Sequence, residues 1–226
     1  ASLGKLSATI AHEINNPLAA VLTYIRLMMK LGERGKFVSE KMEDITRYLN
    51  IMESETARCG EIVKNLLAFS RRSEISIEPQ NIVDIIDKTL MLIEHELEIK
   101  EIRLEKNIEP DLPLIQCDFK QIQQAFLDLM VNASEAMTKG GTLTVKAARS
   151  RKKGFVDVDI ADTGCGIAEE NRQKIFEPFF TTKEESQGVG LGLSVVFGII
   201  TRHKGSIKVE SQLGKGSVFK IRLPVS

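Results

Sequence analysis

The chain has 226 residues, of which 42% are hydrophobic and 27% are charged, a composition typical of globular proteins and unlike that of disordered chains. Its length exceeds that of one small domain and suits two. Thirty-one basic residues balance thirty-one acidic ones, which argues against a nucleic-acid-binding protein, and no apolar run is long enough to span a membrane.

Two long amphipathic helices are predicted at the start of the chain. Apolar residues recur every three or four positions over residues 2–31 and again over 37–71, on either side of a glycine-containing break at 32–35. Helices joined by so short a connection form an antiparallel hairpin. Because one hairpin buries too little surface to be stable alone, we expect a homodimer in which two hairpins form a dimeric four-helix bundle.

The sequence pattern changes near Ser73, where short strands begin to alternate with helices. This mixture predicts an α/β sandwich with helices on one face of a sheet. The expected domains are an all-α hairpin over 1–72, a linker over 73–77 and an α/β domain over 78–226. The predicted helices are 81–99, 118–137 and 192–203, and the predicted strands are 102–107, 142–148, 155–161, 207–211 and 218–223.

The three cysteines, Cys59, Cys117 and Cys165, are odd in number and lack metal-site spacing. They favour reduced thiols in a cytoplasmic protein. Since Ala1 already lies in a helical pattern and no signal peptide is visible, we expect this cytoplasmic chain to be part of a longer protein. A membrane anchor would then belong to the missing N-terminal part.

His12 lies on the first helix, in the segment His-Glu-Ile-Asn-Asn-Pro at 12–17. At about 100° per residue, the apolar stripe of this helix centres opposite His12, so the imidazole is predicted to face outward. Imidazole is a nucleophile when unprotonated, and the adjacent Glu13 can accept its proton. Pro17 cannot donate the helical hydrogen bond, so we expect a bend after His12. An exposed bystander histidine is the alternative for this segment alone.

Asp162 follows a strand whose Val156, Val158 and Ile160 share one face, which places Asp162 on the apolar side. A buried carboxylate needs a hydrogen-bond donor, and the exocyclic amine of adenine is one. A strand-end aspartate that begins an Asp-Thr-Gly turn is the alternative. The glycines at 164 and 166 let the backbone approach a flat base.

A second glycine group at 188–193, Gly-Val-Gly-Leu-Gly-Leu, opens the last helix. Its amides can cradle phosphates, but it does not follow a strand of a βαβ unit, which disfavours a dinucleotide-binding fold. Asp128, Asn132 and Glu135 share one face of helix 118–137. Asn132 can offer Mg²⁺ an oxygen ligand; a solvated polar face is the alternative for this trio.

Five motifs occur in one order: Asn132, the turn at Asp162, Phe-Glu-Pro-Phe-Phe at 176–180, the glycines at 188–193 and Gly-Lys-Gly-Ser at 214–217. In this order they resemble the N, G1, F, G2 and G3 boxes of the ATP-binding domain of two-component histidine kinases, within the wider family of gyrase and heat-shock chaperone ATPases. The segment at 12–17 resembles the phosphoacceptor motif of their nitrogen-regulation-like class.

The resemblance implies that the chain binds ATP and Mg²⁺, with the metal on Asn132. It implies autophosphorylation of His12, with Glu13 as the base, and transfer to a response-regulator receiver domain. Asn16 would orient water for dephosphorylating that regulator. The residues implied at the nucleotide are Asp128, Asn132, Glu135, Asp162, Gly164, Gly166, Ile167, Phe180, Thr181, Thr182, Lys183, Gly188, Val189, Gly190, Leu191, Gly192, Leu193 and Ser217.

Two features depart from the family pattern. Asp128 stands where Asn or Glu is usual, and no Lys or Arg follows Asn132 within one turn. Charge neutralisation must then come from elsewhere, and Lys183 is either a phosphate ligand or a solvated lid residue. His203 is predicted in the last turn of its helix, where a cation is favoured.

Two other functions stay open. One is an ATPase clamp without a phosphoenzyme, in which a carboxylate at Asp128 activates water. The other is a dimeric scaffold with an inert nucleotide pocket. Neither function needs an outward histidine followed by Glu13, so the segment at 12–17 weighs against both.

Overall fold

The computed structural model describes residues 2–33, 42–70, 76–182 and 190–226, and within the two long helices it describes the side chains of 14–30, 43–57, 59, 60 and 63. These residues belong to two compact units, Ala1–Arg71 and Arg72–Ser226. Among the described helices, none combines the length and the hydropathy that a bilayer crossing requires.

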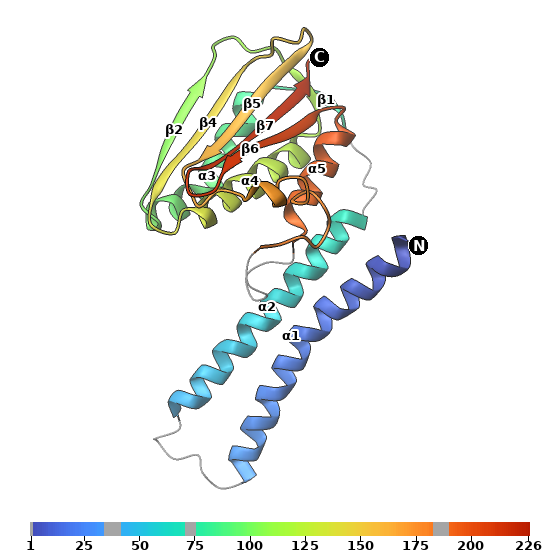
Figure 1. Ribbon diagram of the computed structural model, residues 1–226, viewed down its shortest axis with the longest axis vertical. Helices are drawn as coiled ribbons and strands as arrows, with labels where there is room; N and C mark the ends of the chain where they lie inside the picture. Colours follow the sequence, from blue (N-terminus) through green and yellow to red (C-terminus); the bar gives the residue numbers. More distant parts are fainter. Residues whose placement is uncertain (1, 34–41, 71–75, 183–189) are drawn as a thin grey trace. The chain divides into compact units, whose positions relative to one another are not determined.

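The first unit is a pair of helices, α1 (Ser2–Glu33) and α2 (Met42–Ser70), which pack against each other (Figure 1). Helix α1 continues through Pro17, which is buried. The rings of Tyr24 and Tyr48 connect the helices with their centroids 5.3 Å apart. Cys59 is half-buried, and its Sγ lies 4.0 Å from the Ile14 carbonyl oxygen. The predicted break at 32–35 and the predicted start of the second helix at 37 reach into 34–41, outside the described residues.

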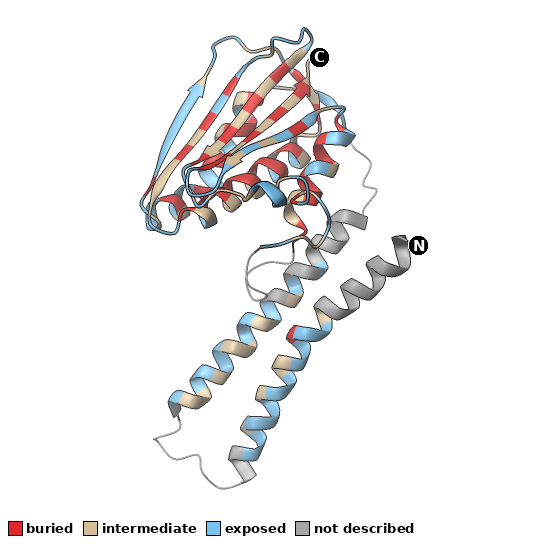
Figure 2. Ribbon diagram, in the orientation of Figure 1, coloured by how far each residue is buried: buried red, intermediate tan, exposed pale blue. Residues whose placement is uncertain are grey.

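One row of apolar side chains on α1 stays exposed in the single chain, and Figure 2 colours much of the described part of this helix as exposed. The row falls at steps of three or four residues, and its members are between 41% and 62% exposed. An apolar row on a surface is the feature that a second hairpin would cover in a four-helix bundle. The dimeric four-helix bundle stays a prediction, and this row is the surface on which the second hairpin would pack. The row consists of Leu18, Leu22, Ile25 and Met29.

The second unit contains a five-stranded sheet in the order β2-β4-β5-β7-β6 (Figure 1). Strands β2 and β4 pair in parallel, and the other neighbours are antiparallel. Each of these strands was predicted to within two residues at either end. They are β2 (Ile102–Ile108), β4 (Gly141–Arg149), β5 (Phe155–Asp162), β6 (Ser206–Gln212) and β7 (Gly216–Pro224).

Two further strands, β1 (Glu78–Gln80) and β3 (Ile115–Cys117), form a separate antiparallel pair. Neither strand was predicted from the sequence. Three residues are too few to show the alternation that identifies a strand. A short 3-10 helix at Glu169–Asn171 was missed for the same reason.

Three helices cover one face of the sheet, as predicted for an α/β sandwich (Figure 1). They are α3 (Ile82–Ile99), α4 (Phe119–Ala136) and α5 (Gly192–Arg202). Helix α4 begins where the Asp118 carboxylate accepts a hydrogen bond from the Gln121 amide at 3.1 Å, an N-cap that satisfies a backbone donor. All the residues predicted on the core side of α4 are buried: Ile122, Phe126, Leu129, Ala133 and Met137.

A partly buried polar contact connects α3 to α4. The Ser134 hydroxyl is fully buried; it donates to Glu96 Oε1 at 2.5 Å and accepts from Lys100 Nζ at 2.9 Å. Burial raises the pKa of Glu96, but its bonds to Lys100 and Ser134 outweigh that effect and hold the pKa below its usual value. The carboxylate is therefore ionised at neutral pH and needs its donors.

Replacing Ser134 with alanine should destabilise the α/β unit. The change removes one donor to an ionised carboxylate and one acceptor of the Lys100 ammonium, which costs about 1–2 kcal/mol. Thermal unfolding should show a melting temperature roughly 2–6 °C lower. Ser206→Ala, at an exposed position on β6, is the matched control. A melting temperature that both variants share with the wild type would contradict this role of Ser134.

Candidate active site

Asp162 ends β5 on the buried side of the sheet, as the alternation predicts. The residue is 8% exposed and its burial pattern continues that of Val156, Val158 and Ile160. Its Oδ1 accepts a hydrogen bond from the Gly164 amide at 2.8 Å. Burial raises the pKa of the Asp162 carboxyl, although the backbone amides of Gly164 and Ser217 oppose the rise. A desolvated acceptor of this kind binds an external donor strongly.

Glycines bring the backbone around Asp162 into close contact. A Cβ atom at Gly164 would lie 2.5 Å from the Ala136 carbonyl oxygen, at the end of α4. Gly166 has φ of +69°, and a Cβ there would lie 2.1 Å from the Gln212 carbonyl oxygen. A Cβ at Gly216 would lie 2.0 Å from the carbonyl oxygen of Asp162 itself. These three positions admit only glycine, so the turn after Asp162 is packed between α4 and the β6–β7 hairpin.

Ser211 was not predicted, yet it holds this turn in place. Its hydroxyl donates to the Gly216 carbonyl at 2.9 Å, accepts from the Ile167 amide at 2.7 Å and lies 3.0 Å from the buried Ser217 hydroxyl. The Gly214 amide adds a bond to the Cys165 carbonyl at 2.7 Å. The structure thus brings the predicted Ile167 and Ser217 together through a serine that no motif indicates.

The predicted polar face of α4 is present. Asp128 and Asn132 are half-buried and Glu135 is exposed, while the opposite face of α4 lies in the core. Gln124 Nε2 donates to Asp128 Oδ1 at 2.6 Å. A Cβ built on Gly192, at the start of α5, would lie 4.0 Å from Asn132 Nδ2. Asn132 is therefore next to the glycine turn predicted to bind phosphates.

The side chains on this face suit a Mg²⁺ ion that keeps most of its ligands from phosphates and water. Among the described residues, no three His, Cys, Asp or Glu side chains gather as a metal site. Mg²⁺ commonly takes one or two protein oxygens together with nucleotide phosphates. The amide oxygen of Asn132 fits that pattern, in which the protein supplies only a small part of the metal's ligands.

The segment at 176–180 packs against the glycine turn before α5. The Phe179 amide donates to the Gly190 carbonyl at 2.9 Å, and Gly190 has φ of +68°. A Cβ at Gly190 would lie 2.6 Å from the Phe180 carbonyl oxygen. Leu191 is buried and Leu193 half-buried, so the turn is anchored by its leucines.

The remaining lid residues are only partly described. Thr181 and Thr182 are exposed. The predicted phosphate contacts Lys183, Gly188 and Val189 lie outside the described residues.

The phosphoacceptor segment lies on α1. The backbones of His12 and Glu13 are helical. Their side chains lie outside the described part of the chain. The prediction that the His12 imidazole faces outward therefore stays a prediction. Asn16, one turn after His12, is exposed.

The predicted position of His203 at the end of its helix is confirmed, but the expectation that a cation is favoured there was wrong. The residue caps α5, but its side chain is 2% exposed and burial lowers its pKa. Helix C-termini favour cations at solvent-exposed positions; here desolvation of the charged imidazolium is the larger effect.

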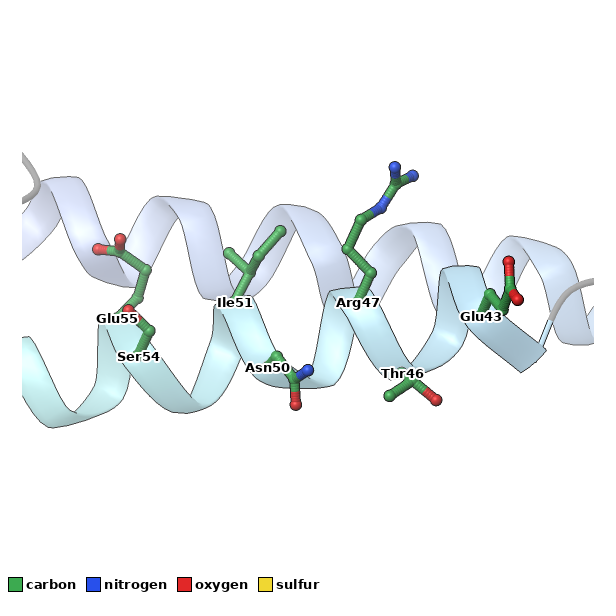
Figure 3. A pocket seen from close by; sticks show the side chains of 7 residues that line it. All are labelled: Glu43, Thr46, Arg47, Asn50, Ile51, Ser54 and Glu55. Carbon is green, nitrogen blue, oxygen red and sulfur yellow. The ribbon is translucent and has the colours of Figure 1, made fainter.

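A surface depression of about 640 Å³ lies along α2, and none of the predicted nucleotide contacts lines it. Figure 3 shows its lining side chains, which come from successive turns of this one helix. It contains no motif residue and we assign it no ligand. Its lining residues are Glu43, Thr46, Arg47, Asn50, Ile51, Ser54 and Glu55.

Two protein-family models match the chain. Residues 2–75 match the His Kinase A (phospho-acceptor) domain, and residues 117–226 match the histidine kinase-, DNA gyrase B-, and HSP90-like ATPase. The two matches include the segment with His12 and all five nucleotide motifs.

Curated relatives show the same pairing of domains. The chain is 37% identical over 224 residues to the sensor histidine kinase ZraS of Salmonella typhi, covering 99% of the chain and 46% of that protein. It is 34% identical over 223 residues to sporulation kinase E of Bacillus subtilis, covering 99% of the chain and 29% of that protein. The chain thus spans less than half the length of these relatives.

Solved structures of histidine kinases are similar to this chain as well. The histidine kinase ThkA in complex with the response regulator protein TrrA has a TM-score of 0.80 and 29% identity, covering 99% of the chain and 62% of that protein. The catalytic domain of ThkA has a TM-score of 0.60 and 30% identity, covering 66% of the chain and 96% of that domain. Full-length ShkA in complex with AMPPNP has a TM-score of 0.69 and 28% identity, covering 98% of the chain and 46% of that protein.

Proposed function

Since the chain belongs to the histidine kinases, with a phospho-acceptor domain before a gyrase B- and HSP90-like ATPase domain, we propose that it transfers the γ-phosphoryl group of ATP to His12. The buried carboxylate of Asp162 supports this proposal most directly. It offers a desolvated acceptor for the adenine amine, and Gly164 and Gly166 let the turn that follows it pack closely against α4 and the β6–β7 hairpin.

The residues would share the work as follows. Asp162 accepts a hydrogen bond from adenine, and the amides at Gly190 to Gly192 bind the phosphates at the start of α5. Asn132 would hold Mg²⁺, which when bound offsets the charge of the phosphates. Positioning and charge neutralisation supply most of the rate enhancement in phosphoryl transfer.

The transfer itself is a substitution at phosphorus. A ring nitrogen of His12 forms the N–P bond, the bond from Pγ to the bridging oxygen breaks, and ADP leaves. The proton on the other ring nitrogen passes to Glu13. His12 then carries the phosphoryl group, which an aspartate of a response regulator accepts.

Partners follow from the same proposal. A relative, ThkA, is solved with a response regulator, which supports a receiver domain as the phosphoryl acceptor. We propose that Asn16 orients water when the phosphorylated regulator is hydrolysed. A second copy of the chain would cover the exposed row on α1, which gives a homodimer.

Incubation of the chain with γ-labelled ATP tests the proposed activity. The expected product is a phosphoprotein whose label is lost in acid and kept in base, as a phosphoramidate requires. Mixing a His12 variant with an Asn132 variant shows whether transfer crosses the dimer. Rapid steady-state ATP hydrolysis without labelled protein would indicate an ATPase clamp, and failure to bind ATP would indicate a scaffold.

A further inference from the structure

His203 is buried at one end of the contact between α4 and α5, and each of its ring nitrogens meets a backbone group. Nδ1 lies 2.8 Å from the Ile199 carbonyl oxygen, one turn earlier in α5. Nε2 lies 3.0 Å from the backbone amide of Asp118, the N-cap of α4. The imidazole therefore joins the end of one helix to the start of the other.

These partners determine the tautomer. A carbonyl oxygen only accepts a hydrogen bond and a backbone amide only donates one, so Nδ1 carries the proton and Nε2 is the acceptor. A protonated imidazolium would direct an N–H group at the Asp118 N–H and would break the bond between the helices. The contact with α4 thus requires a neutral ring.

The surroundings keep the ring neutral. Burial is the largest effect and lowers the pKa of His203. Arg202 acts in the same direction, whereas the Ile199 carbonyl and the Asp118 carboxylate oppose it. That carboxylate also accepts from the Ser76 and Gln121 amides. The neighbouring Cys117 thiol has a pKa raised to about 12 and carries no charge at neutral pH.

The opposite end of the same helix pair is the nucleotide site. Helices α4 and α5 run antiparallel, because Asp118 at the start of α4 meets His203 at the end of α5, and Asn132 lies beside Gly192 at the start of α5. The two ends of α5 are about 16 Å apart at 1.5 Å per residue. A shift of α5 along α4 would therefore move the glycine turn relative to Asn132.

We propose that His203 is a positioning residue of the nucleotide site. Its neutral imidazole sets the register of α5 along α4, and through it the place of the phosphate-binding turn beside Asn132. This inference rests on the proposed binding of ATP. It concerns the triphosphate alone, since Asp162 and its turn belong to β5 and hold the base independently of α5.

Two substitutions distinguish the hydrogen bond of Nδ1 from the hydrogen bond of Nε2. In His203→Asn the side-chain amide can replace Nδ1 and donate to Ile199, but nothing reaches the Asp118 amide. In His203→Gln the side-chain oxygen takes the place of Nε2 and can accept from Asp118. His95→Asn, at a histidine with an 87% exposed side chain on α3, is the matched control.

The measurement is equilibrium binding of ATP and of adenosine to the full chain. His203→Asn should bind ATP about tenfold more weakly, a coupling of the size that commonly links two separate positions in a protein, and should bind adenosine within about twofold of the wild type. His203→Gln and His95→Asn should keep both affinities. Unchanged ATP binding by His203→Asn, a parallel loss of both ligands, or failure of both His203 variants to fold would overturn the proposal.

Acid provides an independent readout. Because burial lowers the pKa of His203, the ring should stay neutral through the ordinary range of histidine titration and protonate only in stronger acid. In that acid range wild-type affinity for ATP should fall more than that of His203→Gln, which has no titratable ring at this position. Other titrating groups, including those of ATP, are common to both proteins and cancel in the ratio. A ratio that stays constant down to the pH at which the wild type unfolds would also overturn the proposal. A wild-type chain that binds no ATP would instead refute the proposed function.

Discussion

His12→Gln is expected to abolish labelling of the chain by γ-labelled ATP, with a rate at least about 10³-fold below that of the wild type. Glutamine has no ring nitrogen that can form the N–P bond. Binding of ATP should stay unchanged, because the ATPase domain folds as a compact unit of its own. Labelling and equilibrium binding, measured on the same preparation, check both parts.

The chain has three histidines, so the assignment can be made completely. His95 is exposed on α3 and pairs with Glu98 at 3.9 Å; His95→Gln is the matched control and should keep full labelling. Both nitrogens of His203 are hydrogen-bonded to the backbone, which leaves none for attack. Label that persists in His12→Gln, or that resists acid as a phosphoserine does, would rule out His12 as the acceptor.

The sequence predicts the secondary structure of the α/β unit well because its longer elements are strongly periodic. Helix α4 is an example: Asp118 supplies the cap, and the core positions from Ile122 to Met137 repeat at helical spacing. Strands β1 and β3 were missed because each depends on its partner, with Gln80 opposite Ile115 and Glu78 opposite Cys117. A pairing across more than thirty residues leaves no local pattern.

The same distinction applies to the candidate site. Burial of Asp162 follows from strand alternation, a local rule. The role of Ser211 does not, because this residue meets Ile167 only after the β6–β7 hairpin returns to the sheet. The expectation for His203 failed for a related reason. The preference for cations at helix C-termini holds where solvent reaches the side chain, whereas the start of α4 excludes solvent from this imidazole. Side chains that connect distant elements are thus the part that local reasoning cannot predict.

Asp162→Asn is expected to weaken ATP binding by roughly 10- to 100-fold. The carboxylate only accepts hydrogen bonds, whereas an amide directs an N–H₂ group at the adenine amine, which is also a donor. One amide oxygen can still accept from Gly164, so the turn keeps that bond. Inosine triphosphate has a carbonyl oxygen in place of the adenine amine. The variant should therefore lose its preference for ATP over inosine triphosphate, which competitive binding measures directly.

Asp159→Asn is the matched control, since Asp159 lies on the same strand with its side chain on the other face of the sheet. It should leave the binding of both nucleotides unchanged.

The raised pKa of Asp162 predicts in addition that nucleotide binding depends on pH. The ionised carboxylate accepts from adenine more strongly than the protonated acid does, and a raised pKa means that protonation begins at a higher pH than for an ordinary aspartate. Affinity for adenosine should therefore fall in mild acid for the wild type and for Asp159→Asn, and stay flat for Asp162→Asn. An unchanged preference for ATP in Asp162→Asn would show that the base is recognised elsewhere, and the buried carboxylate would then serve the turn alone.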